Sequence, residues 1–314
     1  MSGGIGTALV TGATGFIGSA LAARLAAEGT RTVCLVRAES PRKGRLDGLA
    51  GVEVRGVESW SSASIARAIE GLAPDVVFHL AASGVSPDAR DVESLAEGNV
   101  ALTNRILTAL GEAPPRRFLF AGSCSEYAPA PEGERIREDH PLDPPSLYGA
   151  AKAAAALFGK ALAARLGIAF VPLRLFGVYG PGEAPSRLVP HLLSHFRAGT
   201  TPALTPGEQA RDLTYIDDVV EALIAAATAN GIEPGHAYNV CSGVPSLVRE
   251  VALLAARAVG KEGADLGLGR RPYREDEPMW IVGDPARFHE ATGWRARVSL
   301  EEGIRRMAGA NGNS

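Results

Sequence analysis

Tyr148 and Lys152, two side chains capable of acid–base chemistry, stand four positions apart at the start of an alanine-rich stretch. The composition of this stretch predicts a helix over residues 148–166, and side chains four positions apart lie on one helical face. The phenol and the ammonium can therefore be directed toward one site, where the cation favours the phenolate and lowers the tyrosine pKa. The spacing is common, so an exposed helix start would explain it equally well when it is taken alone.

A hydroxyl group is expected near this pair, because Ser123 follows an apolar run at 118–120 that predicts a strand. Residues at strand ends lie where the active-site crevice of a parallel sheet opens. There the Ser123 hydroxyl could donate a hydrogen bond to a developing alkoxide. Cys124 comes next and could be interpreted as a catalytic thiol. The motif contains no histidine, however, so a buried structural cysteine is favoured.

Gly12, Gly15 and Gly18 form the pattern G-x-x-G-x-x-G between an apolar run at 7–10 and a predicted helix at 20–28. Glycines permit a tight turn and a close approach of the backbone to a pyrophosphate. The N-terminus of the next helix presents free N–H groups and the positive end of its dipole to the anion. The flanking strand and helix favour a dinucleotide site over a glycine-rich turn without a ligand.

Arg37 occupies the position, about 20 residues after the glycines, where a dinucleotide fold usually carries an acidic residue that binds the ribose 2′-OH. An arginine cannot accept a hydrogen bond from that hydroxyl, but it can pair with a 2′-phosphate. Arg42 and Lys43 follow closely and could complete the same pocket. The sequence therefore favours NADP over NAD, and the alternative is a solvated basic loop.

Strands and helices alternate along residues 1–176, which predicts an α/β fold, a doubly wound parallel Rossmann sheet in the order 3-2-1-4-5-6-7. From residue 177 onward, proline and glycine punctuate shorter segments. We expect residues 177–210 and 241–314 to form a smaller substrate-binding lobe, and residues 211–240 to return to the dinucleotide-binding domain.

The 314-residue chain has a formal net charge of −3, which gives no electrostatic reason to expect nucleic acid as a partner. No run of about 18 apolar residues predicts a membrane span. The 3 cysteines and 6 histidines lack metal-ligand spacing, so no metal is expected. These features predict a soluble, cytoplasmic protein that does not bind membranes.

With these motifs identified, the chain resembles the extended short-chain dehydrogenase/reductases, and among them the NAD(P)-dependent nucleotide-sugar epimerase/dehydratase family. The matching segments run in family order over nearly the whole chain, at 11–18, 79–82, Asn99, 123–127, 148–152, 174–181, 211–218, 238–240 and 293–294. Each segment alone has low specificity, whereas the combination is highly specific.

The resemblance implies that Tyr148 is the acid/base, that Lys152 binds the nicotinamide ribose and depresses the tyrosine pKa, and that Ser123 holds the sugar hydroxyl or carbonyl. It further implies cofactor contacts from Gly12, Thr14, Gly15, Phe16, Ile17, Gly18, Leu80, Ala81 and Ala82. On the substrate side it implies contacts from Ser125, Arg211 and Arg271. Asn99 could be structural or could hydrogen-bond the substrate.

Departures from the family pattern bear on the reaction. The dehydratases that the chain resembles place Asp-Glu directly after the serine or threonine, whereas this chain has Cys124 and Ser125. Glu126 comes one residue late and, on alternating strand geometry, should point the other way. The acid and base for eliminating water are therefore missing, which argues against a dehydratase.

The resulting prediction is an NADPH-dependent reductase of a keto group, at C4 of a nucleotide-linked deoxy sugar, in deoxysugar biosynthesis. Family epimerases usually retain NAD, whereas Arg37 is better suited to a reductase that exchanges NADP(H) at each turnover. The alternatives are an NAD-dependent nucleotide-sugar epimerase and a non-catalytic NADP-binding sensor. The resemblance also implies a homodimer, in which helices at 95–110 and 149–165 pair into a four-helix bundle, unless these helices simply cover the sheet.

Overall fold

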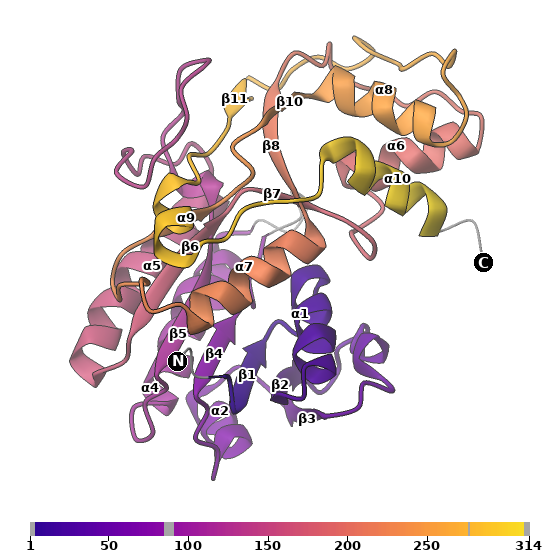
Figure 1. Cartoon of the computed structure of the whole chain (residues 1–314). Coiled ribbons are helices and arrows are strands. Elements are labelled where there is room, and N and C mark those ends of the chain that lie inside the picture. Colours follow the sequence, from indigo (N-terminus) through magenta and orange to yellow (C-terminus); the bar gives the residue numbers. More distant parts are fainter. Residues whose placement is uncertain (1–3, 85–90, 276, 311–314) are drawn as a thin grey trace.

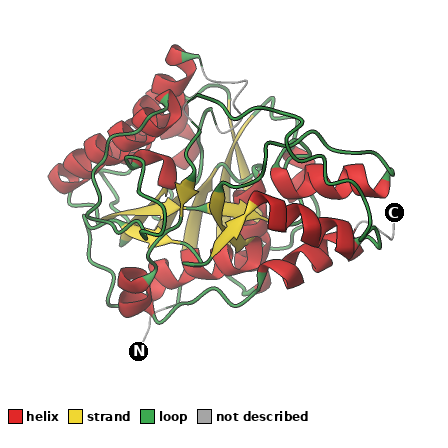
Figure 2. Ribbon diagram, turned by 90° about the horizontal axis from the view of Figure 1, so that it is seen from above, coloured by secondary structure: helices red, strands yellow, loops and turns green. Residues whose placement is uncertain are grey.

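The computed structural model describes residues 4–84, 91–275 and 277–310, and its main feature is a seven-stranded parallel sheet between two layers of helices (Figures 1 and 2). The strand order is β3-β2-β1-β4-β5-β6-β9, so the predicted fold and order are confirmed. The strands are β1 (Thr7–Thr11), β2 (Arg31–Arg37), β3 (Val52–Val57), β4 (Val76–His79), β5 (Arg117–Ser123), β6 (Phe170–Leu175) and β9 (Tyr238–Val240).

The central strands read as continuous apolar runs because helices bury both of their faces. Side chains alternate along each strand, and Leu9 and Val10 of β1 accordingly pack into two different cores. One face is covered by α1 (Phe16–Ala27) and α7 (Ile216–Thr228). The other is covered by α2 (Ser62–Ile69), α4 (Leu102–Ala109) and α5 (Leu147–Leu166).

A smaller layer lies above the carboxyl ends of the main strands (Figure 1). Its sheet contains β7 (Gly177–Tyr179), β8 (Ala210–Tyr215), β10 (Pro245–Leu247) and β11 (Trp280–Ile281). Helices α6 (Leu188–Arg197), α8 (Val248–Ala258) and α10 (Leu300–Ala310) pack together beside it, and α9 (Ala286–Thr292) packs against β9. Within 211–240, β8 thus pairs in the small sheet, while α7 and β9 join the main one.

The segment predicted as one helix at 95–110 is built from three pieces. A single turn, α3 (Val92–Leu95), leads into a π-helical stretch, η2 (Ala96–Ala101), before α4 begins. A Cβ on Gly98 would overlap the Ser83 side chain, so this glycine lets the helix approach the loop after β4. Such π-helical turns are frequent at functional sites.

Among the described residues, no helix combines the length and hydropathy needed to cross a membrane. The same residues contain no group of three or more histidine, cysteine, aspartate or glutamate side chains placed to hold a metal ion.

Candidate active site

The carboxyl ends of β1, β4 and β5 bring the glycine loop, residues 80–83 and Ser123 to one edge of the sheet. Helix α5 starts beside them, with the Ser146 hydroxyl accepting a hydrogen bond from Gly149 N–H at 3.1 Å. A Cβ on Gly149 would overlap the Ser125 carbonyl. The glycine therefore allows the first turn of α5, which carries Tyr148, to pack against the loop that carries Ser123.

Tyr148 lies within hydrogen-bonding reach of the Ser123 side chain, so the structure brings two of the predicted catalytic groups together. Burial, together with the neighbouring Cys124 and Glu126, raises the pKa of Tyr148 to about 12. Ser123 and the charge of Arg187 oppose this shift. The expected lowering of the tyrosine pKa is therefore wrong for the protein alone, because desolvation outweighs the nearby positive charge.

Lys152 lies one turn further along α5 and is 1% exposed. Its Nζ is 4.2 Å from the centroid of the Phe120 ring, a cation–π contact that partly replaces lost hydration. Burial lowers the pKa of Lys152 to about 8, and the charge of Glu126 works against that decrease. A buried ammonium with an aromatic ring as neighbour fits a role in binding the hydroxyls of a ribose.

Glu126 holds the serine loop in place from behind. Its Oε1 accepts a hydrogen bond from Ser123 N–H at 2.8 Å, and its Oε2 accepts one from Arg174 Nε at 2.9 Å. The Glu126 side chain is fully buried, as expected for a residue that points away from the crevice. It is therefore a structural counter-ion and does not replace the acid pair of a dehydratase.

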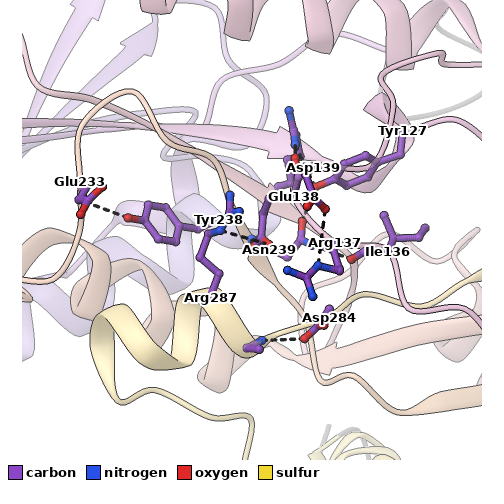
Figure 3. Close-up of polar contacts among 12 residues, drawn as sticks. Tyr127, Ile136, Arg137, Glu138, Asp139, Glu233, Tyr238, Asn239, Asp284 and Arg287 are labelled. Carbon is purple, nitrogen blue, oxygen red and sulfur yellow. Dashed lines mark hydrogen bonds and ion pairs between the residues drawn. The ribbon is translucent and has the colours of Figure 1, made fainter.

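A polar network continues from this ion pair to β9, at the edge of the main sheet, and Figure 3 shows the part of it around Tyr127, Asn239 and Glu138. Arg174 Nη1 donates to the Tyr127 oxygen at 2.9 Å, and Tyr127 O–H donates to Asn239 Oδ1 at 2.6 Å. Asn239 N–H in turn donates to Glu138 Oε1 at 2.9 Å. Several residues behind the family resemblance thus fix the loop that carries Ser123, and one of them, Tyr127, also lines the cavity next to that loop.

The glycine loop has the geometry that a pyrophosphate requires. Gly12 has φ +70°, and a Cβ on it would lie 2.6 Å from Ala81 N, so the loop packs directly on residues 80–81. A Cβ on Gly18 would overlap the Gly12 carbonyl. Gly15 is the N-cap residue of α1 and has no side chain that could cap this helix N-terminus. The loop thus fits an anion supplied by a dinucleotide.

The basic loop after β2 lies beside the glycine loop, because the Ser40 hydroxyl donates to Thr14 Oγ1 at 3.2 Å. Arg37 ends β2 and is exposed, as are Arg42 and Lys43. In the described part of the chain, none of these three cations forms an ion pair with a carboxylate. Their charge is available to a phosphate.

Asn99 sits in the π-helical stretch and is 1% exposed. Its amide nitrogen donates to the carbonyls of Ser83 and Leu95 at 3.2 and 2.9 Å, which fits the structural alternative. Nearby, His79 is fully buried between the hydroxyls of Thr11 and Thr103. Burial lowers the pKa of His79 to about 3, so the ring is neutral and structural.

A cavity of about 180 Å³ lies next to the serine loop and is lined by Cys124, Ser125, Arg274 and Glu277, among others. The predicted substrate residue Arg211 reaches the same region, where its Nη2 donates to Glu277 Oε1 at 2.5 Å. Cys124 is half-buried and lines this cavity, so the expectation of a buried cysteine is wrong. Desolvation nevertheless raises the pKa of Cys124 to about 11, which leaves the thiol protonated at neutral pH.

Arg271 does not line this cavity. Its side chain is exposed, and its backbone N–H donates to the Leu204 carbonyl at 2.9 Å. Arg274 and Glu277, which do line the cavity, were not among the residues predicted from the sequence. The basic segment at 271–274 was a usable signal, but sequence spacing alone does not tell which of its two arginines lines the cavity.

The fold and this set of side chains define a class, the nicotinamide-dinucleotide enzymes whose Rossmann domain carries a paired tyrosine and lysine. The chain matches the NAD dependent epimerase/dehydratase family over residues 8–241 and belongs to that family. The resemblance drawn from the sequence is therefore confirmed, as is the expectation of an enzyme that works with a nicotinamide cofactor.

Relatives with established names cover almost the whole chain. A UDP-glucose 4-epimerase of Mycolicibacterium smegmatis is 32% identical over 306 residues, covering 94% of this chain and 95% of the relative. A dTDP-6-deoxy-L-talose 4-dehydrogenase (NAD(P)(+)) of Kitasatospora kifunensis is 29% identical, covering 95% of this chain and 93% of the relative. The crystal structure of Thermus thermophilus UDP-glucose 4-epimerase with NAD superposes with TM-score 0.86 at 28% identity, covering 98% of this chain and 100% of that one.

Proposed function

We propose that the protein is a nucleotide-sugar 4-epimerase acting on a UDP-linked hexose. The observation that carries the proposal is the chemistry available at the site. Ser123, Tyr148 and Lys152 can transfer one proton. Cys124 and Ser125 do not supply the acid and base that the elimination of water would need. Relatives named as 4-epimerases over 94% of this chain support it. They favour the epimerase alternative over the ketoreductase expected from the sequence.

In this mechanism, Tyr148 as the phenolate would remove the proton from the C4 hydroxyl of the sugar as a C4 ketone forms, and would give that proton back when the ketone is reduced. A bound nicotinamide would accept the C4 hydride and return it to the opposite face of the ketone. Ser123 would donate a hydrogen bond to the C4 oxygen in both directions. Lys152 would hold the nicotinamide ribose, and its positive charge would favour the phenolate against the effect of burial, which raises the tyrosine pKa in the protein alone.

We assign the proposed cofactor contacts to the first turn of α1 and the loop after β4. The backbone of Thr14, Phe16 and Ile17 would bind the pyrophosphate, and residues 80–82 would line the cofactor. On the substrate side, we propose that Arg274 takes the role expected for Arg271, since Arg274 shares a cavity with Ser125. Arg211 would then position Glu277.

The proposal is tested by incubating the protein with UDP-galactose and UDP-glucose and following the configuration at C4 by NMR. A 4-epimerase interconverts the two sugars without net oxidation or reduction of the nicotinamide pool. The second candidate, a 4-ketoreductase, is favoured by Arg37. It would instead oxidise NADPH in step with the reduction of a nucleotide-linked 4-keto sugar.

The Arg37 position predicts a site that accepts NADP at least as well as NAD. Replacing Arg37 with aspartate should weaken NADPH binding about 10- to 100-fold, because a charge-assisted contact to the 2′-phosphate is lost. NADH binding should be unchanged or stronger. Quenching of protein fluorescence by each cofactor gives both dissociation constants, and Arg31→Ala at the other end of β2 is the control. An unchanged NADPH to NADH ratio in Arg37→Asp would rule out the 2′-phosphate site.

The exposed apolar face of α5 is proposed as a homodimer interface. Leu147 and Phe158 lie three turns apart on one face and are each 58% exposed, and Leu157 beside them is 60% exposed. Contact between such a patch and water is unfavourable, so a second copy of the chain is expected to cover it. Phe158→Asp places a charge in that interface and should convert the dimer to a monomer, as measured by light-scattering chromatography. Val244→Glu, at another exposed apolar residue, should leave the mass unchanged. A monomeric wild-type protein would contradict the interface.

A further inference from the structure

Arg45 makes a contact between two segments that are far apart in the sequence. Its Nη2 donates a hydrogen bond to the Gly182 carbonyl at 2.8 Å. Arg45 belongs to the short 3₁₀-helix η1 (Lys43–Leu46) in the basic loop after β2, whereas Gly182 follows β7. The bond thus joins the ribose side of the expected cofactor site to the loop that leads into α6.

The contact lies beside the first turn of α1. Helix η1 packs against α1 and is anchored by Leu46, which is 5% exposed. On the other side, a Cβ on Gly182 would lie 4.0 Å from Cδ2 of Phe16, the first residue of α1. The bond between Arg45 and Gly182 therefore lies beside the Phe16 side chain, in the first turn of the helix where the dinucleotide pyrophosphate is expected.

The guanidinium is equipped to receive an anion there. Within the residues that the structure describes, Arg45 makes the hydrogen bond to Gly182 and no ion pair with a carboxylate. A guanidinium has five N–H donors, so most of them are left for a phosphate, which arginine binds in a bidentate manner.

Glu183, the neighbour of Gly182, gives an independent sign of a ligand at this loop. Its side chain is 7% exposed, and its Oε1 lies 3.4 Å from Arg187 Nε. Its buried Oε2 has no hydrogen-bond partner among the described residues. An unpartnered buried carboxylate oxygen is unfavourable, whereas a dinucleotide brings ribose hydroxyls and a carboxamide that can donate to it.

We propose that Arg45 binds the cofactor pyrophosphate and, through its bond to Gly182, holds the loop after β7 against the bound dinucleotide, so that the cofactor leaves slowly. This inference rests on the nicotinamide cofactor of the family. Only the advantage of slow cofactor release depends on the proposed function, since an enzyme that returns the hydride to the same sugar gains from keeping its cofactor between turnovers.

The test compares Arg45→Ala with Arg31→Ala, which removes an exposed cation from the opposite end of β2 and breaks no bond between the two loops. NADH is preloaded, and its release into excess ADP-ribose is followed by fluorescence. Release should accelerate roughly 10- to 100-fold in Arg45→Ala and stay at the wild-type rate in Arg31→Ala. Arg45→Lys keeps the positive charge but cannot bind a phosphate in a bidentate manner, so its rate of NADH release should lie between those of the wild type and Arg45→Ala. This variant replaces Arg45→Ala in the test if the alanine variant does not fold.

Calorimetry with two fragments locates the effect. Arg45→Ala should weaken binding of ADP-ribose, which contains the pyrophosphate, and leave binding of adenosine unchanged. Wild-type release rates in Arg45→Ala, or an equal loss for adenosine, would overturn the proposal. Because neither measurement uses a sugar substrate, a negative epimerase assay would leave this result standing.

Discussion

Tyr148→Phe should lower the rate of C4 inversion about 10²- to 10⁴-fold, because the only atom removed is the oxygen that exchanges the proton with the substrate. The Michaelis constant and the affinity for NADH should change little, since the ring and its packing remain. Initial rates at saturating nucleotide sugar measure the effect.

The matched control is Tyr215→Phe, which removes a phenol oxygen from a residue that is 3% exposed and lies in the small sheet. This variant should turn over at close to the wild-type rate. Near wild-type turnover by Tyr148→Phe would show that another group carries the proton, and the role assigned to Tyr148 would be abandoned.

Glu126→Ala should destabilise the protein by about 3–5 kcal/mol, the range for breaking a buried ion pair by removing one partner. The variant leaves the Arg174 guanidinium, whose side chain is 7% exposed, without its carboxylate. It also leaves Ser123 N–H without its acceptor. Urea unfolding at 25 °C measures the change in the free energy of unfolding. Glu126→Gln should lose less, because the amide oxygen can still accept the Ser123 N–H.

Glu53→Ala is the control for this prediction, because Glu53 pairs with Arg31 and Arg55 while remaining 41% exposed. Exposed pairs contribute less than about 1 kcal/mol, so this variant should unfold near the wild-type midpoint. Equal losses in Glu126→Ala and Glu53→Ala would show that the buried pair does not hold the serine loop.

The main sheet could be predicted because its strands are buried on both faces. Val76–His79 is buried throughout, and such a run is recognisable without knowing its partners. The small sheet gave no comparable signal, since β10 and β11 contain 3 and 2 residues and obtain their hydrogen bonds from β8, a distant segment. Likewise, Gly98 of the π-helical turn at 96–101 lies close to Ser83, a contact that the local sequence does not predict.

The positions of Tyr148, Lys152 and Ser123 could be expected from local spacing and strand ends, but their electrostatics could not. Whether Lys152 lowers the pKa of Tyr148 depends on how deeply both are buried, and burial raises the tyrosine pKa to about 12. The choice between Arg271 and Arg274 also depends on long-range contacts. A backbone hydrogen bond to Leu204 anchors residue 271, while Arg274 lines the cavity.

Following C4 of UDP-galactose by NMR, in the presence of the purified protein and catalytic amounts of NAD or NADP, distinguishes a 4-epimerase from a 4-ketoreductase. We expect conversion to UDP-glucose until the two sugars reach equilibrium, with no net change in the absorbance of the reduced cofactor at 340 nm. Oxidation of NADPH in step with consumption of a nucleotide-linked 4-keto sugar, with no inversion of UDP-galactose, would contradict this expectation.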